Sequence, residues 1–207
     1  MGISLKAEKK SIWEPEDIRT FVNTADAMGY YSMGTAVLLN EWMGQRAGDI
    51  ITMTMGAYRD GNIYITQSKT GAQVALPIDI VATLKARIES QIKENKARTI
   101  SGTHLIQQHT GQPFKSDWFS HLFGKIRKKA LEDMDEKRTQ HFKKLIFQSL
   151  RHTAVTRLAE AGCEIPEIAS ITGHSFTACQ DIVDRYNVRT KKMARNAFIK
   201  RSSQEKQ

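Results

Sequence analysis

The side chains of this 207-residue sequence that could support chemistry are mainly cationic. Lysine and arginine total 31 against 22 aspartates and glutamates, a net charge of +9, and this balance favours a polyanionic partner such as nucleic acid. Each arginine carries a planar guanidinium, which can hold two phosphate oxygens through paired hydrogen bonds. The sequence contains no G-x-x-x-x-G-K phosphate loop, H-E-x-x-H zinc motif or G-x-S-x-G nucleophile motif. On charge alone, a merely basic protein without a nucleic-acid partner is the alternative.

Two segments in the first half of the chain resemble motifs of the tyrosine recombinases, the phage integrase family. The run from Leu39 to Ile50 is similar to the first arginine box of that family, and the resemblance makes Arg46 its first catalytic arginine. The segment from Gln67 to Gly71 reads Q-S-K-T-G on an expected hairpin and resembles the β-hairpin lysine motif, with Lys69 as that lysine.

Two further segments follow in the order that the family uses. The run from Ser149 to Gly162 resembles the second arginine box, with Arg151 as the second arginine. The sequence T-G-H-S that ends at Ser175 resembles the box that supplies His174, and Tyr186 lies downstream, where the family has its nucleophile. One such motif is weak evidence, but all of them in the family's order make a specific signal.

The resemblance implies a role for each of these side chains. Arg46 and Arg151 would stabilise the charge that grows on the phosphate oxygens as Tyr186 attacks a phosphodiester. Lys69, on a flexible hairpin, would protonate the leaving 5′ oxygen. His174 would donate a hydrogen bond to the phosphate. Neither a metal nor another cofactor is expected, because a phosphotyrosine intermediate conserves the energy of the broken bond.

One position departs from the family pattern. The second box usually reads H-x-x-R, and here Gln148 stands in place of that histidine, three residues before Arg151. Glutamine can hydrogen-bond a phosphate but cannot shuttle a proton. Three outcomes follow: slower cleavage that relies on the cationic pocket, a natural variant that tolerates the change, or an inactive DNA-binding relative. The interval from His174 to Tyr186 is also somewhat longer than in familiar members.

Other polar residues near these motifs are interpreted as supporting groups. Asp49 is expected to orient its neighbours in the site rather than act directly. His152 is interpreted as a packed helix histidine rather than a catalyst. Cys163, His174 and Cys179 match no common zinc spacing, so no metal site is predicted.

The apolar pattern predicts a mainly α-helical protein with a small three-stranded antiparallel sheet, an α+β arrangement that agrees with the recombinase catalytic-domain fold. Helices are expected over about 15–28, 32–42, 81–92, 116–126, 150–161, 165–171 and 175–183. In the sheet region, alternation predicts a first strand over 51–55, and a hairpin signal at Asp60 and Gly61 precedes two more strands. Ser116 is expected to cap its helix. The segment 131–142, which includes the acidic residues Glu132, Asp133, Asp135 and Glu136, is expected to form an exposed loop or a frayed helix end.

The domain organisation follows from these elements. We expect a flexible segment over 1–12, a catalytic domain over 13–187 and a basic segment over 188–207. The last segment carries a short apolar stripe, which we expect to dock on a neighbouring protomer or, alternatively, on its own domain. Because the arm-binding and core-binding regions of the family have no counterpart here, a fragment or a minimal member is expected.

The remaining composition agrees with a cytoplasmic protein. No apolar run reaches the length that a membrane helix needs, no secretion signal opens the chain, and the two cysteines form no pair motif. A phage or bacterial origin with nucleoid association is the setting that the family resemblance implies.

The sequence therefore predicts a site-specific recombinase that integrates or excises a mobile element through a 3′-phosphotyrosine. The expected partner is double-stranded DNA, bound by a homotetramer on two DNA sites, with a monomer in the absence of DNA. Two alternatives stay open: a type IB topoisomerase-like relaxation activity, and a non-catalytic DNA-binding relative.

Overall fold

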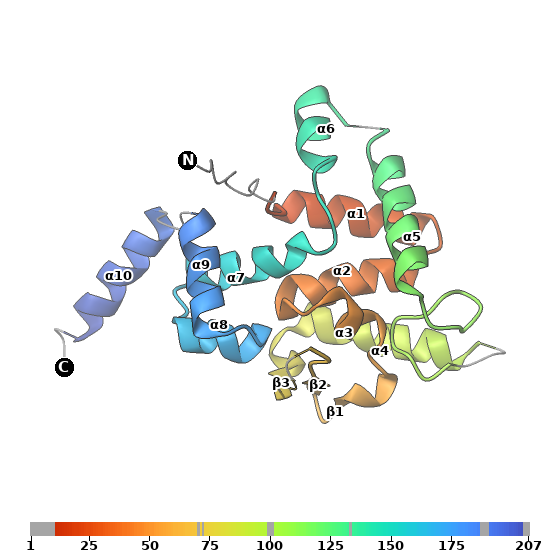
Figure 1. Cartoon of the computed structure of the whole chain (residues 1–207), viewed down its shortest axis with the longest axis horizontal. Coiled ribbons are helices and arrows are strands. Elements are labelled where there is room, and N and C mark those ends of the chain that lie inside the picture. The colour runs from red at the N-terminus through yellow and green to blue at the C-terminus, as the bar shows by residue number, and fades with distance from the viewer. Residues whose placement is uncertain are drawn as a thin grey trace, which may run out of the picture.

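The structure is a computed structural model that describes residues 11–69, 71, 73–98, 102–132, 134–186 and 191–204. Helices make up most of the fold and one small sheet lies at its lower edge in Figure 1, so the predicted fold class is confirmed. The helices are α1 (Pro15–Ala27), α2 (Tyr31–Met43), α3 (Ala47–Ile51), α4 (Ala82–Lys96), α5 (Ser116–Ala130), α6 (Glu136–Phe142), α7 (Ser149–Ala161), α8 (Ile165–Thr172), α9 (Phe176–Tyr186) and α10 (Lys191–Gln204). The strands are β1 (Tyr58–Arg59), β2 (Asn62–Thr66) and β3 (Gln73–Pro77).

Capping residues explain where helix α1 begins and where helix α2 ends. Pro15 occupies the first position of α1, where its missing N–H is not needed, and Glu14 and Asp17 form a reciprocal capping box. Helix α2 is buried over most of its surface and lies against α1, α4 and α7. It ends at Gly44, whose φ of 57° is the left-handed conformation that glycine adopts without a steric penalty.

The sheet confirms two of the three predicted strands and corrects the first. Strands β1, β2 and β3 pair antiparallel in that order, and Asp60 and Gly61 both have positive φ in the tight turn between β1 and β2. The strand predicted over 51–55 is wrong, because Ile51 ends α3 and Met55 begins a 3₁₀ turn. Met53 and Met55 instead exchange backbone hydrogen bonds of 2.8 Å with the 103–105 segment, a distant partner that alternation cannot reveal.

Two other predictions at element boundaries are corrected. Ser116 is the first residue of α5 and Lys115 is its cap, so the predicted Ser116 cap is wrong by one position. The segment predicted as an exposed loop or frayed end contains α6, with Asp135 accepting a cap hydrogen bond from the backbone of Arg138. Helix α6 ends at the fully buried Phe142, and a single apolar residue gives almost no periodic signal.

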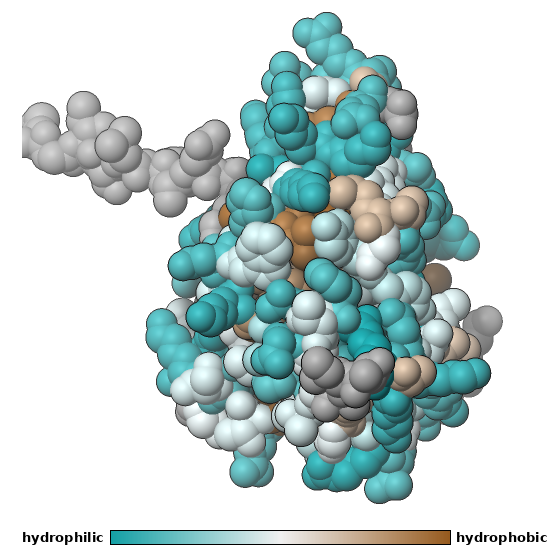
Figure 2. Space-filling model, turned by 90° about the vertical axis from the view of Figure 1, so that its right-hand side faces the viewer, coloured by the Kyte–Doolittle hydropathy of each residue, from teal (hydrophilic) through white to brown (hydrophobic). Residues whose placement is uncertain are grey.

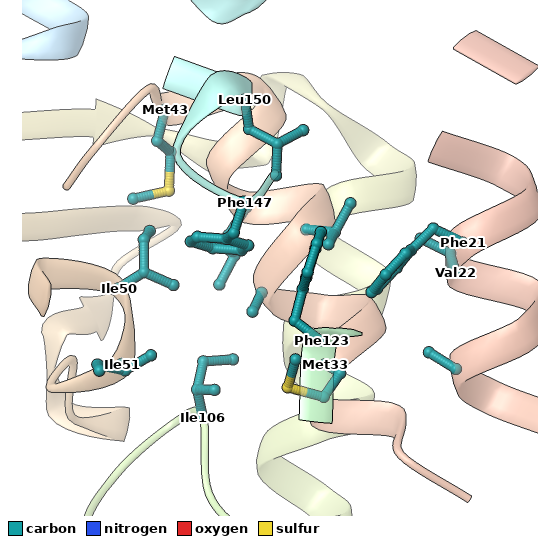
Figure 3. Packing of buried hydrophobic residues seen from close by; sticks show 14 of the residues in the cluster. Phe21, Val22, Met33, Met43, Ile50, Ile51, Ile106, Phe123, Phe147 and Leu150 are labelled. Carbon is teal, nitrogen blue, oxygen red and sulfur yellow. The ribbon is translucent and has the colours of Figure 1, made fainter. Parts of the chain in front are cut away.

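The described residues pack into two hydrophobic clusters of different size. The large cluster includes aromatic contacts such as Phe21 stacked on Phe123, with ring centroids 4.7 Å apart (Figure 3). The small cluster lies among α7, α8 and α9: Val155, Ala159, Ile168, Ala169, Cys179 and Ile182. Helix α7 belongs to both, since Leu150 lies in the large cluster and Val155 in the small one.

The face that Figure 2 presents is largely hydrophilic, with a brown hydrophobic area near its centre. In the ranges that the structure describes, every helix is too short or too polar to cross a membrane.

Candidate active site

One cavity of about 670 Å³ brings together four of the six predicted site residues: Arg46, Lys69, Gln148 and Arg151. Arg46 precedes α3, Lys69 lies in the turn after β2, and Gln148 and Arg151 belong to the start of α7. Segments about 100 residues apart in the chain therefore converge on one surface.

Arg46 is held from both sides by polar side chains. Its Nη1 donates a hydrogen bond of 2.8 Å to Oε1 of Gln67 and lies 3.9 Å from Oδ2 of Asp49. The other oxygen of Asp49 accepts hydrogen bonds from Ser68, 3.1 Å from its backbone nitrogen and 2.8 Å from its hydroxyl. Asp49 thus connects Arg46 to the segment that leads into Lys69, which is the positioning role expected of this carboxylate.

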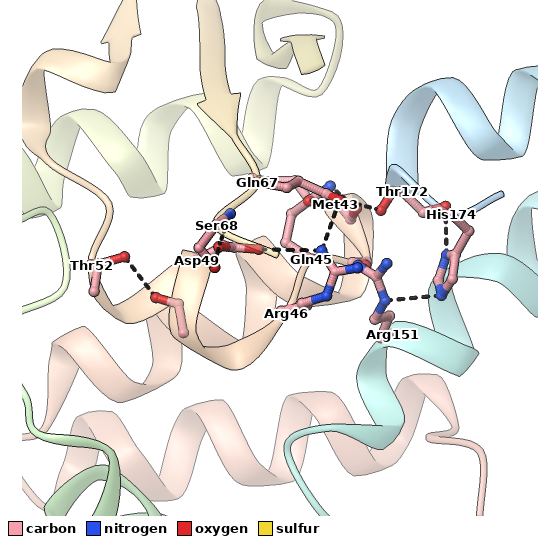
Figure 4. A network of polar contacts seen from close by, with 12 residues as sticks. Met43, Gln45, Arg46, Asp49, Thr52, Gln67, Ser68, Arg151, Thr172 and His174 are labelled. Carbon is pink, nitrogen blue, oxygen red and sulfur yellow. Dashed lines mark hydrogen bonds and ion pairs between the residues drawn. The ribbon is translucent and has the colours of Figure 1, made fainter. Parts of the chain in front are cut away.

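A pair of fully buried glutamines lies behind Arg46 (Figure 4). Gln67 donates from Nε2 to Oε1 of Gln45 at 2.5 Å and to the carbonyl of Thr172 at 2.9 Å. Gln45 donates to the carbonyls of Met43 and Ile171 at 2.8 and 2.7 Å. These amides join the ends of α2, β2 and α8, and sequence reasoning missed both, because a buried amide has no periodic signature.

Arg151 and His174 form a second fixed pair. Arg151 donates from Nε to Nε2 of His174 at 2.9 Å and from Nη1 to the carbonyl of Gly44. Since a guanidinium only donates, Nε2 of His174 must be the acceptor, and the ring proton therefore lies on Nδ1. Nδ1 is 2.8 Å from the hydroxyl of Thr172, which donates onward to the carbonyl of Ile168 at 2.8 Å. In this arrangement both nitrogens of His174 are used within the protein.

The electrostatics of the pair point to an anion site. Burial, with the nearby Arg46, lowers the pKa of Arg151 to about 10, so the guanidinium stays charged at neutral pH. Burial, together with the electrostatic influence of Arg151, His152 and Arg46, lowers the pKa of His174 to about 3, so its imidazole stays neutral. Two like charges held close in a partly buried cavity repel each other, and a bound phosphate would relieve that repulsion.

Tyr186 is the last residue of α9 and lies beside His152. Its Oη is 2.9 Å from Nδ1 of His152, and the two rings meet edge to face with centroids 5.7 Å apart. His152 in turn lines the cavity that holds Arg46 and Arg151, which brings the phenol next to that cavity. Burial raises the pKa of Tyr186, and Arg185 partly offsets this rise.

His152 is the residue of the site that sequence reasoning undervalued. It was expected to be a packed helix histidine, and it is half-buried on α7 with its ring directed at the phenol of Tyr186. Its position four residues after Gln148 places both on one helical face, and that spacing was the available signal.

Helix α5 and the loop before α7 extend the cavity. Ser116 and Ser120 line it from α5, and a second hollow of about 310 Å³ shares Phe119, Ser120 and Gln148 with it and reaches Arg127. Arg127 donates to the carbonyl of Leu145 at 2.6 Å, and this contact holds α5 against the loop. The second hollow is lined mostly by apolar side chains, and it extends the cationic cavity as far as Arg127.

Metal ligands do not gather around these residues. Across the residues described, no group of three or more histidine, cysteine, aspartate or glutamate side chains is placed to hold a metal ion. Cys163 and Cys179 are free thiols, and burial raises the pKa of each.

Comparison with known proteins agrees with the fold and the motifs. The sequence model of the phage integrase family matches residues 13–192. The chain is 37% identical over 65 residues to prophage integrase IntE of Escherichia coli K12, a match that covers 31% of this chain and 17% of that protein. The chain therefore spans only a small part of the length of this curated relative.

Solved structures give the same fold at lower identity. The lambda integrase catalytic core superposes with a TM-score of 0.62 and 23% identity, over 80% of this chain and 92% of that one. A lambda integrase tetramer bound to a Holliday junction superposes with a TM-score of 0.66 and 22% identity, over 87% of this chain and 50% of that one. This chain belongs to the phage integrase family.

Proposed function

We propose that the protein is a tyrosine-type site-specific recombinase that cleaves and rejoins double-stranded DNA during integration or excision of a mobile element. The observation that carries the proposal is the placement of Arg46, Lys69 and Arg151 around one cavity, with the phenol of Tyr186 next to it. Two guanidiniums suit a phosphodiester because each can pair with two of its oxygens.

The proposed reaction proceeds in two transfers. The Oη of Tyr186 attacks the scissile phosphorus, which gives a 3′-phosphotyrosine and a free 5′ hydroxyl. Arg46 and Arg151 stabilise the charge that develops on the non-bridging oxygens. Lys69, exposed in the turn after β2, supplies the proton for the leaving 5′ oxygen. Attack by the 5′ hydroxyl of a partner strand then releases the tyrosine and completes the exchange.

His174 holds Arg151 in the state described here, since its Nε2 accepts the hydrogen bond from the guanidinium. The donation from His174 to the phosphate that the resemblance implies therefore requires this contact to open and Nε2 to take up a proton when DNA binds. Gln148 lines the cavity and suits a hydrogen bond from its amide to a phosphate oxygen.

The proposed assembly is a homotetramer on two DNA sites, formed from monomers when DNA binds. Residues 13–187 would be the catalytic domain and 188–207 a basic segment that docks on a neighbouring protomer. Helix α10 hydrogen-bonds to its own α7 through Asn196 and Lys200, while Phe198 and Ile199 are 75% and 51% exposed. These exposed apolar side chains support a partner on the outer face of α10. Such an enzyme would work on DNA in the cytoplasm, at the nucleoid.

Two other functions use the same cavity. A type IB topoisomerase-like enzyme would form the same covalent adduct but rejoin the original strand. A non-catalytic relative would bind DNA without any adduct, and glutamine at position 148 is the observation that favours it.

A suicide-substrate assay in EDTA tests the proposal. The probe is a library of nicked duplexes with randomised sequence around the nick, so that the cleaved fragment diffuses away and the adduct accumulates. We expect the wild type to give a denaturation-resistant protein–DNA band, Tyr186→Phe to give none, and sequencing of the trapped DNA to yield a preferred duplex.

The outcomes separate the three functions. Joining of the trapped strand to a second duplex supports a recombinase, and relaxation of supercoiled plasmid without joining supports the topoisomerase-like alternative. Binding that falls steeply with salt but leaves no adduct, in the wild type and in Gln148→His alike, would establish the non-catalytic relative.

A further inference from the structure

We propose that His152 is the catalytic base that takes the proton of Tyr186 during attack, in the place that Gln148 cannot fill. This inference rests on the proposed function, because it assigns a residue to the tyrosine chemistry of the same site. It also differs from the sequence-based interpretation of His152 as a packing residue.

The geometry places an imidazole nitrogen directly beside the reacting atom. Nδ1 of His152 lies 2.9 Å from Oη of Tyr186, within the range over which a base can remove a proton. The same ring borders the cavity with Arg46 and Arg151, so phenol, imidazole and phosphate would be neighbours in the bound complex.

The geometry of helix α7 explains how His152 can take the role of the histidine that the family usually has at position 148. Gln148 is the residue before its first turn, and His152 lies one turn further along on the same face. An imidazole at position 152 therefore reaches the neighbourhood of the site from a point one turn deeper in the helix. Tyr186 at the end of α9 meets it there, since α7 and α9 pack against each other.

The proton has a complete path. In the neutral ring with its proton on Nε2, Nδ1 keeps a lone pair and accepts the hydrogen bond that Oη of Tyr186 donates. As the bond from Oη to phosphorus forms, the phenolic proton moves to Nδ1 and the bond from phosphorus to the 5′ oxygen breaks. That oxygen takes its proton from Lys69. In rejoining, His152 returns the proton to Oη, and the attacking 5′ hydroxyl gives its own proton to Lys69.

The surroundings make such a base necessary. Burial raises the pKa of Tyr186, which keeps the phenol protonated at neutral pH. The cations Arg46, Lys69 and Arg151 around the cavity would oppose a positive charge on His152 in the empty site, and the charge of a bound phosphate offsets them. The base would therefore act only when DNA is in place.

The test separates removal of the tyrosine proton from protonation of the leaving group. It measures the rate of adduct formation with the preferred nicked duplex and with the same duplex carrying sulfur as the bridging 5′ atom. A thiolate is a good leaving group without protonation, so this substrate removes the need for an acid but not for a base. The variants are His152→Asn, Lys69→Ala and, as a matched control, His109→Asn, which removes an exposed histidine in a loop away from the cavity.

We expect His152→Asn to lose about 10²-fold in rate on both substrates, which is the usual contribution of a general base. Lys69→Ala should be slow on the oxygen substrate and largely restored on the sulfur substrate, and His109→Asn should match the wild type on both. A wild-type rate in His152→Asn, or its rescue by sulfur, would overturn the assignment while leaving the proposed function intact. No adduct from the wild type on either substrate would overturn both.

A second measurement needs neither DNA nor a variant at position 152. The imidazole nitrogen spectrum of ¹⁵N-histidine-labelled protein at neutral pH should show His152 with its proton on Nε2 and with an Nδ1 signal that changes in Tyr186→Phe. A proton on Nδ1 in the wild type would contradict the inference, because that nitrogen could then accept nothing.

Discussion

The two halves of the site are supported in different ways. Arg46 rests on the large cluster and on the buried amides of Gln45 and Gln67, where several hydrogen bonds define one position. Tyr186 lies at the end of a helix held by the small cluster, which is built from few side chains. The half with Arg46, proposed to bind phosphate, is therefore the rigid reference, and the half with Tyr186, the proposed nucleophile, is the part that can open at lower free energy.

Helix α7 links the two halves and carries one proposed functional side chain for each. Arg151 is tied to the carbonyl of Gly44 at the end of α2, on the rigid side, while His152 faces Tyr186 on α9. A displacement of α9 would therefore remove the phenol from its base without disturbing the guanidinium.

The largest expected effect is on the rate of adduct formation and comes from removing Arg151, which lies on the rigid side of the site. Arg151→Ala should lower the rate of adduct formation by about 10²–10³-fold, because it removes a donor aimed at the developing charge. Arg151→Lys should recover only part of this rate, since an ammonium cannot form the paired contact. Single-turnover cleavage measures the loss, and Arg19→Ala, an exposed arginine on α1, is the control that should match the wild type.

Truncation in the small cluster should loosen the nucleophile's half. Ile168→Ala removes a fully buried side chain and should lower stability by about 2–5 kcal/mol, mostly as local opening. Hydrogen exchange should quicken in α8 and α9 well before it does in α2. Phe123→Ala in the large cluster is the counterpart, and it should quicken exchange in both halves. Equal patterns from the two variants would remove the distinction between the clusters.

The buried amide bridge, formed by Gln45 and Gln67, should have an effect of intermediate size on stability and on the rate of adduct formation. Gln67→Leu leaves the side-chain oxygen of Gln45 and the carbonyl of Thr172 without their donor, at a cost of about 1–3 kcal/mol of unfolding free energy. It should also slow adduct formation, because Arg46 loses an acceptor. Urea unfolding and cleavage assays measure the two effects. The same change at the exposed Gln73 on β3 should alter neither, and an unaffected Gln67→Leu would show that the bridge does not fix Arg46.

The smallest expected effect is on the slope of the unfolding free energy against pH. The pKa of His174 falls to about 3 in the folded protein, below the value of about 6.5 for an unperturbed histidine. The unfolded state therefore binds more protons between these values, and stability should fall as the pH drops from 6.5 toward 3. The partly exposed side chain keeps this slope below the limit of about 1.4 kcal/mol per pH unit. Urea unfolding of the wild type and His174→Gln at several pH values should show a shallower slope in the variant.

The motifs of the site could be predicted from the sequence because they are short and keep their order. The helices at 15–27 and 149–161 could also be predicted, since Pro15 and Gly162 mark a start and an end. Partners distant in sequence could not be predicted. Met53 and Met55 alternate like a strand but pair with another segment, and the contact between His152 and Tyr186 spans 34 positions.

Gly173, the glycine of the T-G-H-S box, sets how closely the hairpin can approach the end of α8. Its φ is 63°, and a β-carbon there would lie only 2.2 Å from Nε2 of Gln67. The space that a side chain would take is already filled by that amide, so any substitution must displace the side chain of Gln67. The oxygen of the same amide accepts the hydrogen bond from Arg46. The position of the Arg46 guanidinium therefore depends on the absence of a side chain at a distant point in the chain.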